Sequence, residues 1–469
     1  MAEATPSPIV HLDVDARRAR GRGARQSVPR GKHADWSPAP ERPDPVALIA
    51  GQEISRVPEL LPIRHERMLA SPFTFYRGAA ILMAADLAAQ DDTGLRVQAC
   101  GDAHLANFGG FAAPDRRIVV DMNDFDETAP GPFEWDVKRL VASFELAWRE
   151  NGFSSKEGRK IVVDTAKAYR QGMRDFAAMG DLELWYSRLD VEGVLERWGP
   201  GLSQEARDRF LRNVGKAEAK NSLKALAKLT EVVDGQHRIK ADPPLIVPVR
   251  DLSEDPEALV SWLHERFRDY RRSLQADRRH LLEGYRIVDV ARKVVGVGSV
   301  GTRCWIILLM GRDDQDPLFI QVKEANESVL EPYAGRSGYA SHGQRVVEGQ
   351  RLLQSASDIL LGWTTAVGLD GVQHEFYLRQ LWDGKLSPAY ETMSPEILGV
   401  FAEVCGRTLA RGHARSGDRV AIDAYLGNGS TFDVAMADFA VTYAEQNQRD
   451  YEAVAAAVAS GRLAPLPAA

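Results

Sequence analysis

Two acidic segments in the first third of the chain hold the residue types that phosphate chemistry needs. Asp102 and Asn107 stand in a D-x-x-x-x-N arrangement, and Asp124 follows in the segment NDFDE. Phosphoryl transfer requires an aspartate that accepts the proton of the attacking hydroxyl, and oxygen ligands that hold Mg²⁺ against the phosphates. The spacing therefore predicts Asp102 as the catalytic base, with Asn107 and Asp124 as magnesium ligands.

The elements around these segments are those that would bring them together. Short strands are predicted over residues 95–99 and 118–121, each running into one acidic segment, and a helix is predicted over 137–148. A further helix is predicted to start at Ser71 and Pro72, where a capping hydroxyl precedes a first-turn proline. Single acids and glycines in loops often only end strands or cap helices. The whole ordered set, rather than any one aspartate, therefore favours a functional site.

A glycine-rich motif stands much later in the chain. Gly296, Gly298 and Gly301 form a G-x-G-x-x-G pattern between strands predicted over 287–295 and 302–310. A dinucleotide-binding fingerprint would open a helix here, whereas the sequence predicts a strand that turns and returns. We therefore interpret the motif as a hairpin that covers the phosphates of a nucleotide.

A lysine and a glutamate follow the glycine motif at the places a nucleotide site would require. Lys323 ends the returning strand predicted over 318–323, where its charge is expected to neutralise the α- and β-phosphates of ATP. Glu348 lies on a helix predicted over 342–355 and is expected to pair with Lys323. The alternative is that Lys323 and Glu348 are ordinary exposed surface residues, as most lysines and glutamates are.

The acidic segments also carry a family resemblance. The string CGDAHLANFGG, followed by VVDMNDFDETAPGPFEWDVKRL, resembles the catalytic loop and metal segment of the aminoglycoside phosphotransferase and choline kinase branch of the kinase-like superfamily. From RHERMLASPFTFYRGAA to NDFDETAPGPFEWDVKRL the chain is similar to the bacterial domain of unknown function 2252 family, and this similarity extends from VPRGKHADW to YAEQNQRDYEAV.

The resemblance assigns roles residue by residue. It implies that Asp102 is the base, that Asn107 and Asp124 bind magnesium with Asp126 as a rival ligand, and that Asp136 is a buried structural partner of the catalytic loop. Cys100 stands where those kinases have the first histidine of an H-G-D triplet, which leaves open how the loop is braced. The resemblance implies the chemistry and assigns no substrate.

The order of the motifs differs from that of ordinary kinases, in which the glycine loop and lysine precede the catalytic loop. Because a site depends on where groups meet in space, a circular permutation would preserve it. We therefore expect an α+β, protein-kinase-like two-lobe fold that is circularly permuted. The expected parts are a flexible basic arm over 1–45, a helical catalytic lobe with the metal site and a helical insertion over 46–284, a mixed β-rich nucleotide-binding lobe over 285–385, and helices that complete the catalytic lobe over 386–469.

Composition narrows the class of protein. The formal net charge of -7 provides no general attraction for nucleic acid, so a charged substrate has to be met by a local site. Three widely spaced cysteines without metal-ligand spacing indicate reduced thiols and a cytoplasmic location. No secretory signal and no apolar run long enough for a bilayer is visible, so no membrane partner is expected. The sequence leaves the oligomeric state unspecified.

These observations predict an ATP- and magnesium-dependent phosphotransferase that acts on an unidentified hydroxyl of a small molecule or a protein. Three alternatives stay open: a nucleotide-binding pseudokinase, an enzyme that transfers AMP from the same site, and a metal-dependent phosphoesterase. The presence of Asp102, Asn107 and Asp124 together disfavours the pseudokinase. The phosphoesterase is disfavoured because its companion Asp-x-His and Gly-Asn-His segments are missing, and His104 is expected to brace the loop instead.

Overall fold

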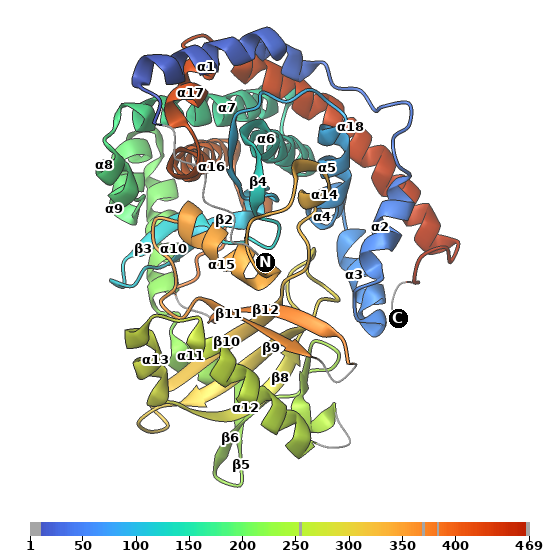
Figure 1. The fold of residues 1–469 in the computed structure, drawn as a ribbon, viewed down its shortest axis with the longest axis vertical. Helices are drawn as coiled ribbons and strands as arrows, with labels where there is room; N and C mark the ends of the chain where they lie inside the picture. Colours follow the sequence, from blue (N-terminus) through green and yellow to red (C-terminus); the bar gives the residue numbers. More distant parts are fainter. Residues whose placement is uncertain (1–10, 253–255, 368–370, 382–383, 466–469) are drawn as a thin grey trace, which may run out of the picture.

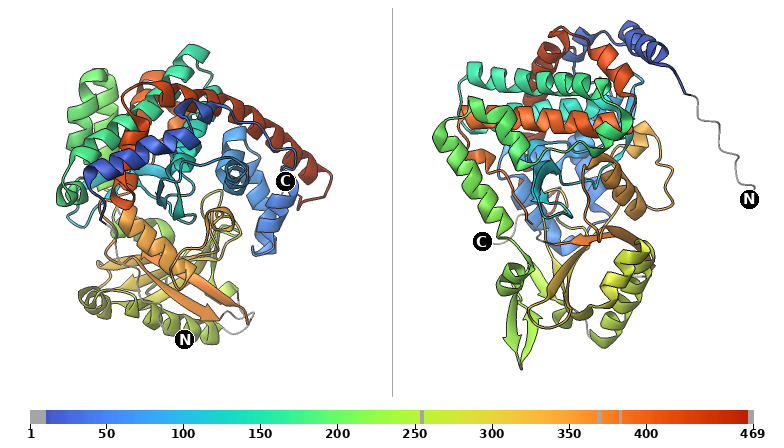
Figure 2. Two further views of the ribbon diagram at one scale, coloured as in Figure 1. Left: turned by 45° about the horizontal axis from the view of Figure 1, so that its top comes forward. Right: turned by 90° about the vertical axis from the view of Figure 1, so that its left-hand side faces the viewer.

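The computed structural model describes residues 11–252, 256–367, 371–381 and 384–465. It shows a mixed α+β fold with antiparallel sheets, which confirms the predicted class (Figure 1). One large sheet with its helices occupies the lower part of the view in Figure 1, and a larger group of helices occupies the upper part. Figure 2 shows the same division from two other directions.

The described part of the predicted basic arm is folded against the C-terminal helices. Helix α1 (Val14–Ser27) lies along α17 (Arg419–Leu426), and a Cβ added to Gly21 would lie 1.9 Å from the Ala421 carbonyl oxygen. Arg17 Nε contacts Asp418 at 2.7 Å, and Arg25 Nε donates to the Tyr425 carbonyl at 2.8 Å. The prediction of a flexible arm over 1–45 therefore differs from the structure within 11–45, because these arginines have partners in the C-terminal helices. Residues 1–10 lie outside the described part.

The segment after α1 contributes to the core. It contains the 3-10 helix η1 (Arg30–Ala34) and helix α2 (Pro45–Glu53). His33 is 3% exposed and lies 2.8 Å from the Tyr425 hydroxyl, while Trp36 is 4% exposed and packs on Tyr443. Arg42 binds both Asp86 and Asp450, each at 2.6 Å. Folded structure therefore begins well before residue 46.

Three short helices lead to the first acidic segment. After the 3-10 helix η2 (Pro58–Leu60), they are α3 (Leu61–Met68), α4 (Pro72–Gly78) and α5 (Ala80–Ala88). The predicted helix start is confirmed, because the Ser71 hydroxyl accepts from Thr74 N–H at 3.1 Å and Pro72 opens the first turn.

Four short strands explain why the two acidic loops meet. They are β1 (Arg96–Ala99), β2 (Phe108–Ala112), β3 (Ile118–Met122) and β4 (Ala129–Pro132). β1 pairs with β4 and β2 pairs with β3, both antiparallel, with Ala99 opposite Ala129 and Phe108 opposite Met122. The β1–β2 and β3–β4 connections therefore leave the paired strands at the same end.

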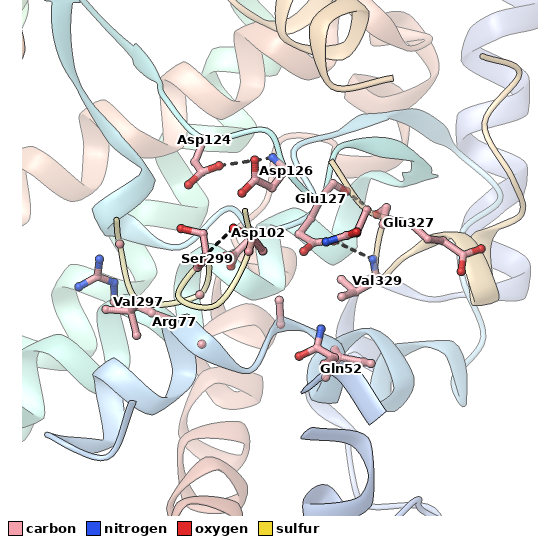
Figure 3. Close-up of a pocket in the computed structure, with 18 of the residues that line it drawn as sticks. Gln52, Arg77, Asp102, Asp124, Asp126, Glu127, Val297, Ser299, Glu327 and Val329 are labelled. Carbon is pink, nitrogen blue, oxygen red and sulfur yellow. Dashed lines mark hydrogen bonds between the residues drawn. The ribbon is translucent and has the colours of Figure 1, made fainter. Parts of the chain in front are cut away.

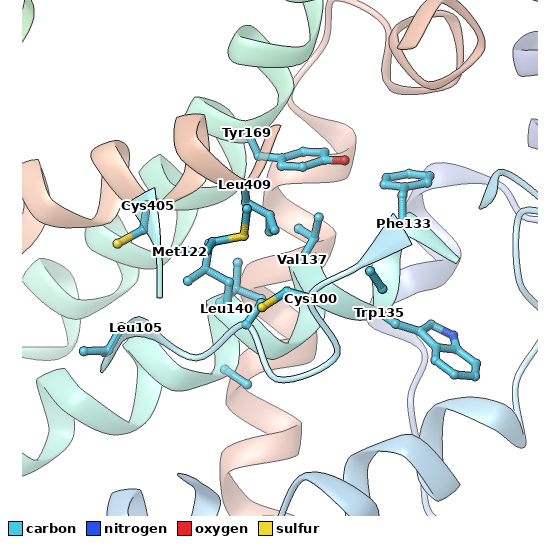
Figure 4. Packing of buried hydrophobic residues seen from close by; sticks show 14 of the residues in the cluster. Cys100, Leu105, Met122, Phe133, Trp135, Val137, Leu140, Tyr169, Cys405 and Leu409 are labelled. Atoms are coloured by element: carbon cyan, nitrogen blue, oxygen red, sulfur yellow. The ribbon is translucent and has the colours of Figure 1, made fainter. Parts of the chain in front are cut away.

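A helical core supports these loops. It is built from α6 (Phe133–Glu150), α7 (Ser155–Ala178), α16 (Pro395–Ser416), α17 and α18 (Thr431–Ala459). Figure 4 shows Cys100, Leu105 and Met122, from the two loop regions, beside Leu140 of α6 and Leu409 of α16. The chain that carries the acidic residues therefore rests directly on close-packed apolar side chains, which fixes its path.

The large sheet has six antiparallel strands in the order β11-β12-β10-β9-β8-β7. Their bounds are β7 (Ile246–Pro248), β8 (Arg286–Lys293), β9 (Cys304–Met310), β10 (Pro317–Glu324), β11 (Gly362–Val367) and β12 (Gln373–Gln380). Helices α14 (Glu331–Ala334) and α15 (His342–Leu353) connect β10 to β11. In Figure 1, α15 lies between the sheet and the upper helices.

Both faces of this sheet are covered by helices from before residue 285. Ile307 and Leu309 of β9 pack with Phe267 and Tyr270 of α12 (Pro256–Arg272), whereas Ile306 and Leu308 pack with Leu226 of α11 (Ser222–Leu229). The sheet unit therefore starts earlier than the expected lobe boundary, because amphipathic helices carry no local sign of the surface they cover. The remaining elements of this region are α8 (Asp181–Tyr186), α9 (Val191–Trp198), η4 (Gly199–Gly201), α10 (Gln204–Glu218), β5 (Thr230–Val233), β6 (Gln236–Ile239), η5 (Val249–Asp251) and α13 (Ala276–Glu283).

No described helix combines the length and the apolar character that crossing a bilayer requires.

Candidate active site

The predicted site residues surround one cavity of about 450 Å³ (Figure 3). Its lining includes six of the nine residues singled out from the sequence: Asp102, Asn107, Asp124, Asp126, Gly296 and Gly298. Lys323 contacts two of these carboxylates from β10. Gly301 and Glu348 are not among the lining residues. Carboxylates dominate the lining, since Glu127, Glu324 and Glu327 join the three aspartates.

Asp136 holds the turn that presents Asp102. Its carboxylate accepts from the N–H groups of Cys100 at 2.6 Å and Gly101 at 2.9 Å, and it is 1% exposed. His413 Nε2 of α16 lies 3.0 Å from the same carboxylate, and the Tyr169 hydroxyl lies 2.9 Å from His413 Nδ1. The expected structural role of Asp136 is confirmed. His413, far along the chain, braces this turn through Asp136, and the Cys100 thiol donates to the Asp124 carbonyl at 3.3 Å.

Gly101 is required at this turn. It has φ of +84°, and an added Cβ would lie 2.1 Å from the Glu127 carbonyl oxygen. The two acidic loops therefore touch backbone to backbone, at a distance that only glycine permits.

The Asp102 carboxylate is held by one of its two oxygens. Arg139 of α6 donates to Asp102 Oδ1 from Nε at 2.9 Å and lies 2.8 Å away through Nη2, while the guanidinium stacks 3.8 Å from the Tyr76 ring centre. Burial raises the pKa of Asp102, Arg139 opposes this increase, and the Asp124 charge adds to it. Oδ2 is 3.6 Å from His104 Nε2 and is the carboxylate oxygen that Arg139 does not contact.

Asn107 and Asp124 are the two residues of the cavity that could hold a divalent ion. Asn107 Nδ2 donates to the Asp102 carbonyl at 2.8 Å, which leaves Oδ1 as a free oxygen donor at the cavity. Burial acts to raise the pKa of Asp124, but Lys323 and Arg379 outweigh it, so the pKa is lowered and the group is ionised.

This donor set fits Mg²⁺ better than a metal held by protein alone. Within the described ranges, no three His, Cys, Asp or Glu side chains are arranged to hold a metal ion. Mg²⁺ usually keeps several waters and binds through one or two carboxylates together with substrate phosphates. Asn107 and Asp124 would therefore hold the ion jointly with a phosphate ligand.

Lys323 reaches the second acidic loop from the large sheet. Its ammonium, on a side chain only 3% exposed, donates to Asp126 Oδ2 and lies 3.8 Å from Asp124 Oδ1. The Tyr377 hydroxyl donates to Asp126 Oδ1 at 2.8 Å. Burial acts to lower the pKa of Lys323, but Asp124 and Asp126 outweigh it and raise the pKa well above its ordinary value. Both oxygens of Asp126 are thus occupied, which favours Asp124 over Asp126 as a metal ligand.

Glu348 does not meet Lys323. It pairs instead with Arg351, three residues along α15, at 3.0 Å. The expected Lys323–Glu348 pair is therefore absent from the structure, in which Lys323 contacts Asp126 instead.

The glycine-rich segment connects β8 to β9 and is fixed from outside by arginines. Arg67 donates to the Gly296 carbonyl and Arg64 to the Gly298 carbonyl, both at 2.8 Å, while Arg56 donates to the Val300 carbonyl. Every second carbonyl from Gly296 to Val300 thus accepts a hydrogen bond from an arginine. Among the described residues, no hydrogen-bond acceptor faces the N–H groups of Val297, Gly298 and Ser299, which line the cavity.

Glu127 is a cavity residue that the sequence did not single out. Burial raises the pKa of Glu127 to about 7, and the charges of Asp126 and Asp102 add to this increase. A hydrogen bond from the Val329 N–H, at 2.7 Å, and the charge of Arg345 oppose it in part. Its position after Asp126 was visible in the sequence, but its surroundings come from distant segments.

Comparison with known proteins places most of the chain in one group. Residues 56–457 match the model of a family described as an uncharacterized protein conserved in bacteria, DUF2252. No curated protein and no solved structure matches the chain.

Proposed function

The chain belongs to the bacterial family DUF2252, and from the geometry of its cavity we propose that it is an ATP- and magnesium-dependent phosphotransferase. One observation carries the proposal: Lys323 of the large sheet and Asp124 of the second acidic loop meet at 3.8 Å, in a cavity that Asp102 and Asn107 also line. Phosphoryl transfer between ATP and a hydroxyl needs this combination of a base, two oxygen ligands and a lysine.

Each group has one task in the proposed reaction. Mg²⁺ at Asn107 and Asp124 would neutralise charge on the phosphates. The acceptor oxygen attacks the γ-phosphorus of ATP while its proton passes to Asp102 Oδ2. The bond to the bridging oxygen between the β- and γ-phosphates breaks, and ADP leaves with that oxygen.

The glycine segment supports the binding of a triphosphate. Its carbonyls are bound by arginines, and successive unpaired N–H groups form the kind of concave surface that binds anions. Lys323 would move from Asp126 to the α- and β-phosphates when the nucleotide enters. Because carboxylates outnumber the basic side chains that line the cavity, a triphosphate needs its magnesium to bind.

The order of the elements supports the permuted kinase-like arrangement. A strand pair with a glycine connection, β8 and β9, is followed by β10 with its lysine and then by helix α15, as in the nucleotide lobe of kinases. The short distance between Lys323 and Asp124 is what a permuted chain would have to produce.

The alternatives are weighed by the same residues. A phosphoesterase with two metals needs clustered His and Asp ligands, which the described residues do not form. AMP transfer would use the same cavity and is separated from phosphate transfer by its product. With ATP as donor, ADP release indicates phosphate transfer and pyrophosphate release indicates AMP transfer.

A thermal-shift experiment tests the proposal. ATP with MgCl₂ is expected to stabilise the wild-type chain, by about 2.7 kcal/mol at a concentration a hundred times Kd. ATP without magnesium should give little shift. Asp124→Ala is expected to lose most of the effect, whereas Asp277→Ala, an exposed aspartate on α13, keeps it. Equal shifts in wild type and Asp124→Ala would contradict the proposal.

A further inference from the structure

The cavity has a cationic side that the proposed donor chemistry leaves unused. Among its lining residues the arginines are Arg56 and Arg77. Arg56 is occupied by the Val300 carbonyl of the glycine segment. Arg77, on α4, forms no ion pair with any carboxylate in the described part of the chain. Its side chain has a hydrogen bond with Tyr390, and its Nε is buried without a hydrogen-bond partner. A guanidinium that lines a cavity and has no carboxylate partner is available to bind an anionic ligand.

Arg77 lies on the base side of the cavity. In Figure 3, Arg77 and Glu127 lie on opposite sides, with Asp102 between them. The charge of Arg77 acts on Asp102 and His104, whereas the basic groups that act on Asp124 are Lys323, Arg379 and Lys385. The donor phosphates belong with Asp124 and Lys323, so Arg77 faces the place of the acceptor.

The wall beside Arg77 is formed by packed aromatic rings. Phe73 is fully buried and contacts the rings of both Tyr390, at 4.9 Å, and His104, at 6.3 Å. His104 is 3% exposed, lines the cavity and has a buried Nδ1 without a hydrogen-bond partner. Burial, together with the charges of Arg77 and Arg139, lowers the pKa of His104 well below its ordinary value. A hydrogen bond with its own backbone opposes this decrease only in part, so the ring is neutral.

We propose that Arg77, with the His104 ring beside it, binds a carboxylate or phosphate group of the acceptor and so positions the acceptor hydroxyl at Asp102. The inference rests on the proposed function and names the acceptor class as hydroxylated anions. Arg77 suits this task because its planar guanidinium can bind an oxyanion through two hydrogen bonds. Arg77 touches the substrate, whereas Phe73 only positions the wall.

The test measures binding of small anions to the full-length chain saturated with Mg-ADP, so that the donor phosphate positions are occupied. The anionic probes are inorganic phosphate, glycerate and glycerol 3-phosphate, and glycerol is the neutral probe. Isothermal titration calorimetry is expected to show that at least one anionic probe binds and that glycerol does not. Arg77→Gln should weaken anion binding about tenfold or more, and His104→Asn should weaken it to a smaller extent.

The controls separate this inference from the proposed function. Mg-ADP affinity should stay within about twofold in Arg77→Gln, and Arg18→Gln on the exposed side of α1 should change neither affinity. If Mg-ADP binds but no anionic probe does, the inference is wrong and the proposed function stands. If Arg77→Gln weakens Mg-ADP as much as the anion, Arg77 serves the donor and the inference is also wrong. If Mg-ADP does not bind the wild type, the proposed function itself fails.

Discussion

The Lys323 ammonium donates a hydrogen bond to Asp126, although 197 residues separate them along the chain. The contact joins the large sheet to the second acidic loop. In the absence of nucleotide it places the cation beside both carboxylates of that loop, since Asp124 Oδ1 is also 3.8 Å away. Lys323, which we propose binds the donor phosphates, is thus held in position by Asp126, two residues from the proposed metal ligand Asp124.

Removing this cation should weaken nucleotide binding. Lys323→Met keeps a long apolar stem in a side chain that is 3% exposed but removes the charge. We expect the affinity for Mg-ATP to fall about ten- to a hundredfold, because α- and β-phosphates lose their neutralising partner. Calorimetric titration measures the change, with Lys156→Met on the exposed surface of α7 as the matched control. Equal affinity in Lys323→Met and wild type would remove Lys323 from the nucleotide site.

Replacing the base should separate binding from turnover. Asp102→Asn keeps a side-chain oxygen that can accept a hydrogen bond from Arg139. The amide, however, cannot take up a proton near neutral pH. Turnover, followed as ADP release, is expected to fall by about 10²- to 10⁴-fold. The Kd for Mg-ATP should change by less than about threefold. A variant that binds poorly would instead indicate that Asp102 holds the nucleotide.

Glu127 should make stability depend on pH in a defined direction. Its pKa is raised from 4.5 to about 7 in the folded chain, so between these values the folded state holds a proton that the unfolded state has released. Stability is therefore expected to decrease as pH rises from about 4.5 to 7, relative to Glu127→Gln, which does not titrate. The expected difference is about 1–3 kcal/mol.

Urea unfolding of both proteins at pH 5 and pH 8 measures this difference. The other titrating groups are shared, so their contribution cancels in the comparison. A difference in unfolding free energy between wild type and Glu127→Gln that is the same at pH 5 and pH 8 would show that the Glu127 pKa is not raised in the folded chain.

Two glycines with positive φ form a matched pair for testing the contact between the acidic loops. Gly101→Ala places a Cβ 2.1 Å from the Glu127 carbonyl oxygen, whereas Gly94→Ala, at φ of +67°, meets nothing within 4 Å. We expect Gly94→Ala to cost about 1 kcal/mol of unfolding free energy through backbone strain alone. Gly101→Ala should cost about 3 kcal/mol or more and lower the response to Mg-ATP. Similar losses in the two variants would mean that the loops can separate.

The sequence predicted the parts of the site that depend on neighbouring residues. Asp102, Asn107 and Asp124 follow short strands, and the pairing of those strands carries the loops to one end. The helix start at Ser71 was equally predictable, since a capping hydroxyl and a first-turn proline act within one turn.

The remaining parts depend on contacts that no local pattern encodes. Arg139 lies in a predicted amphipathic helix, where an arginine is expected to be exposed, yet it is 3% exposed and binds Asp102. His413 contacts Asp136 across 277 residues, and Glu348 pairs with Arg351 whereas Lys323 contacts Asp126. The kinase-like arrangement itself stays a prediction.

The packing of residues 11–45 has a practical consequence for recombinant work. A fragment cut at residue 56, where the family match begins, would lack Trp36, His33 and Arg42. It would leave the Tyr425 and Phe432 rings uncovered, and it would leave Asp86 and Asp450 without their shared guanidinium. Aggregation or low solubility of such a fragment would therefore result from the position of the truncation. Expression should start upstream of α1.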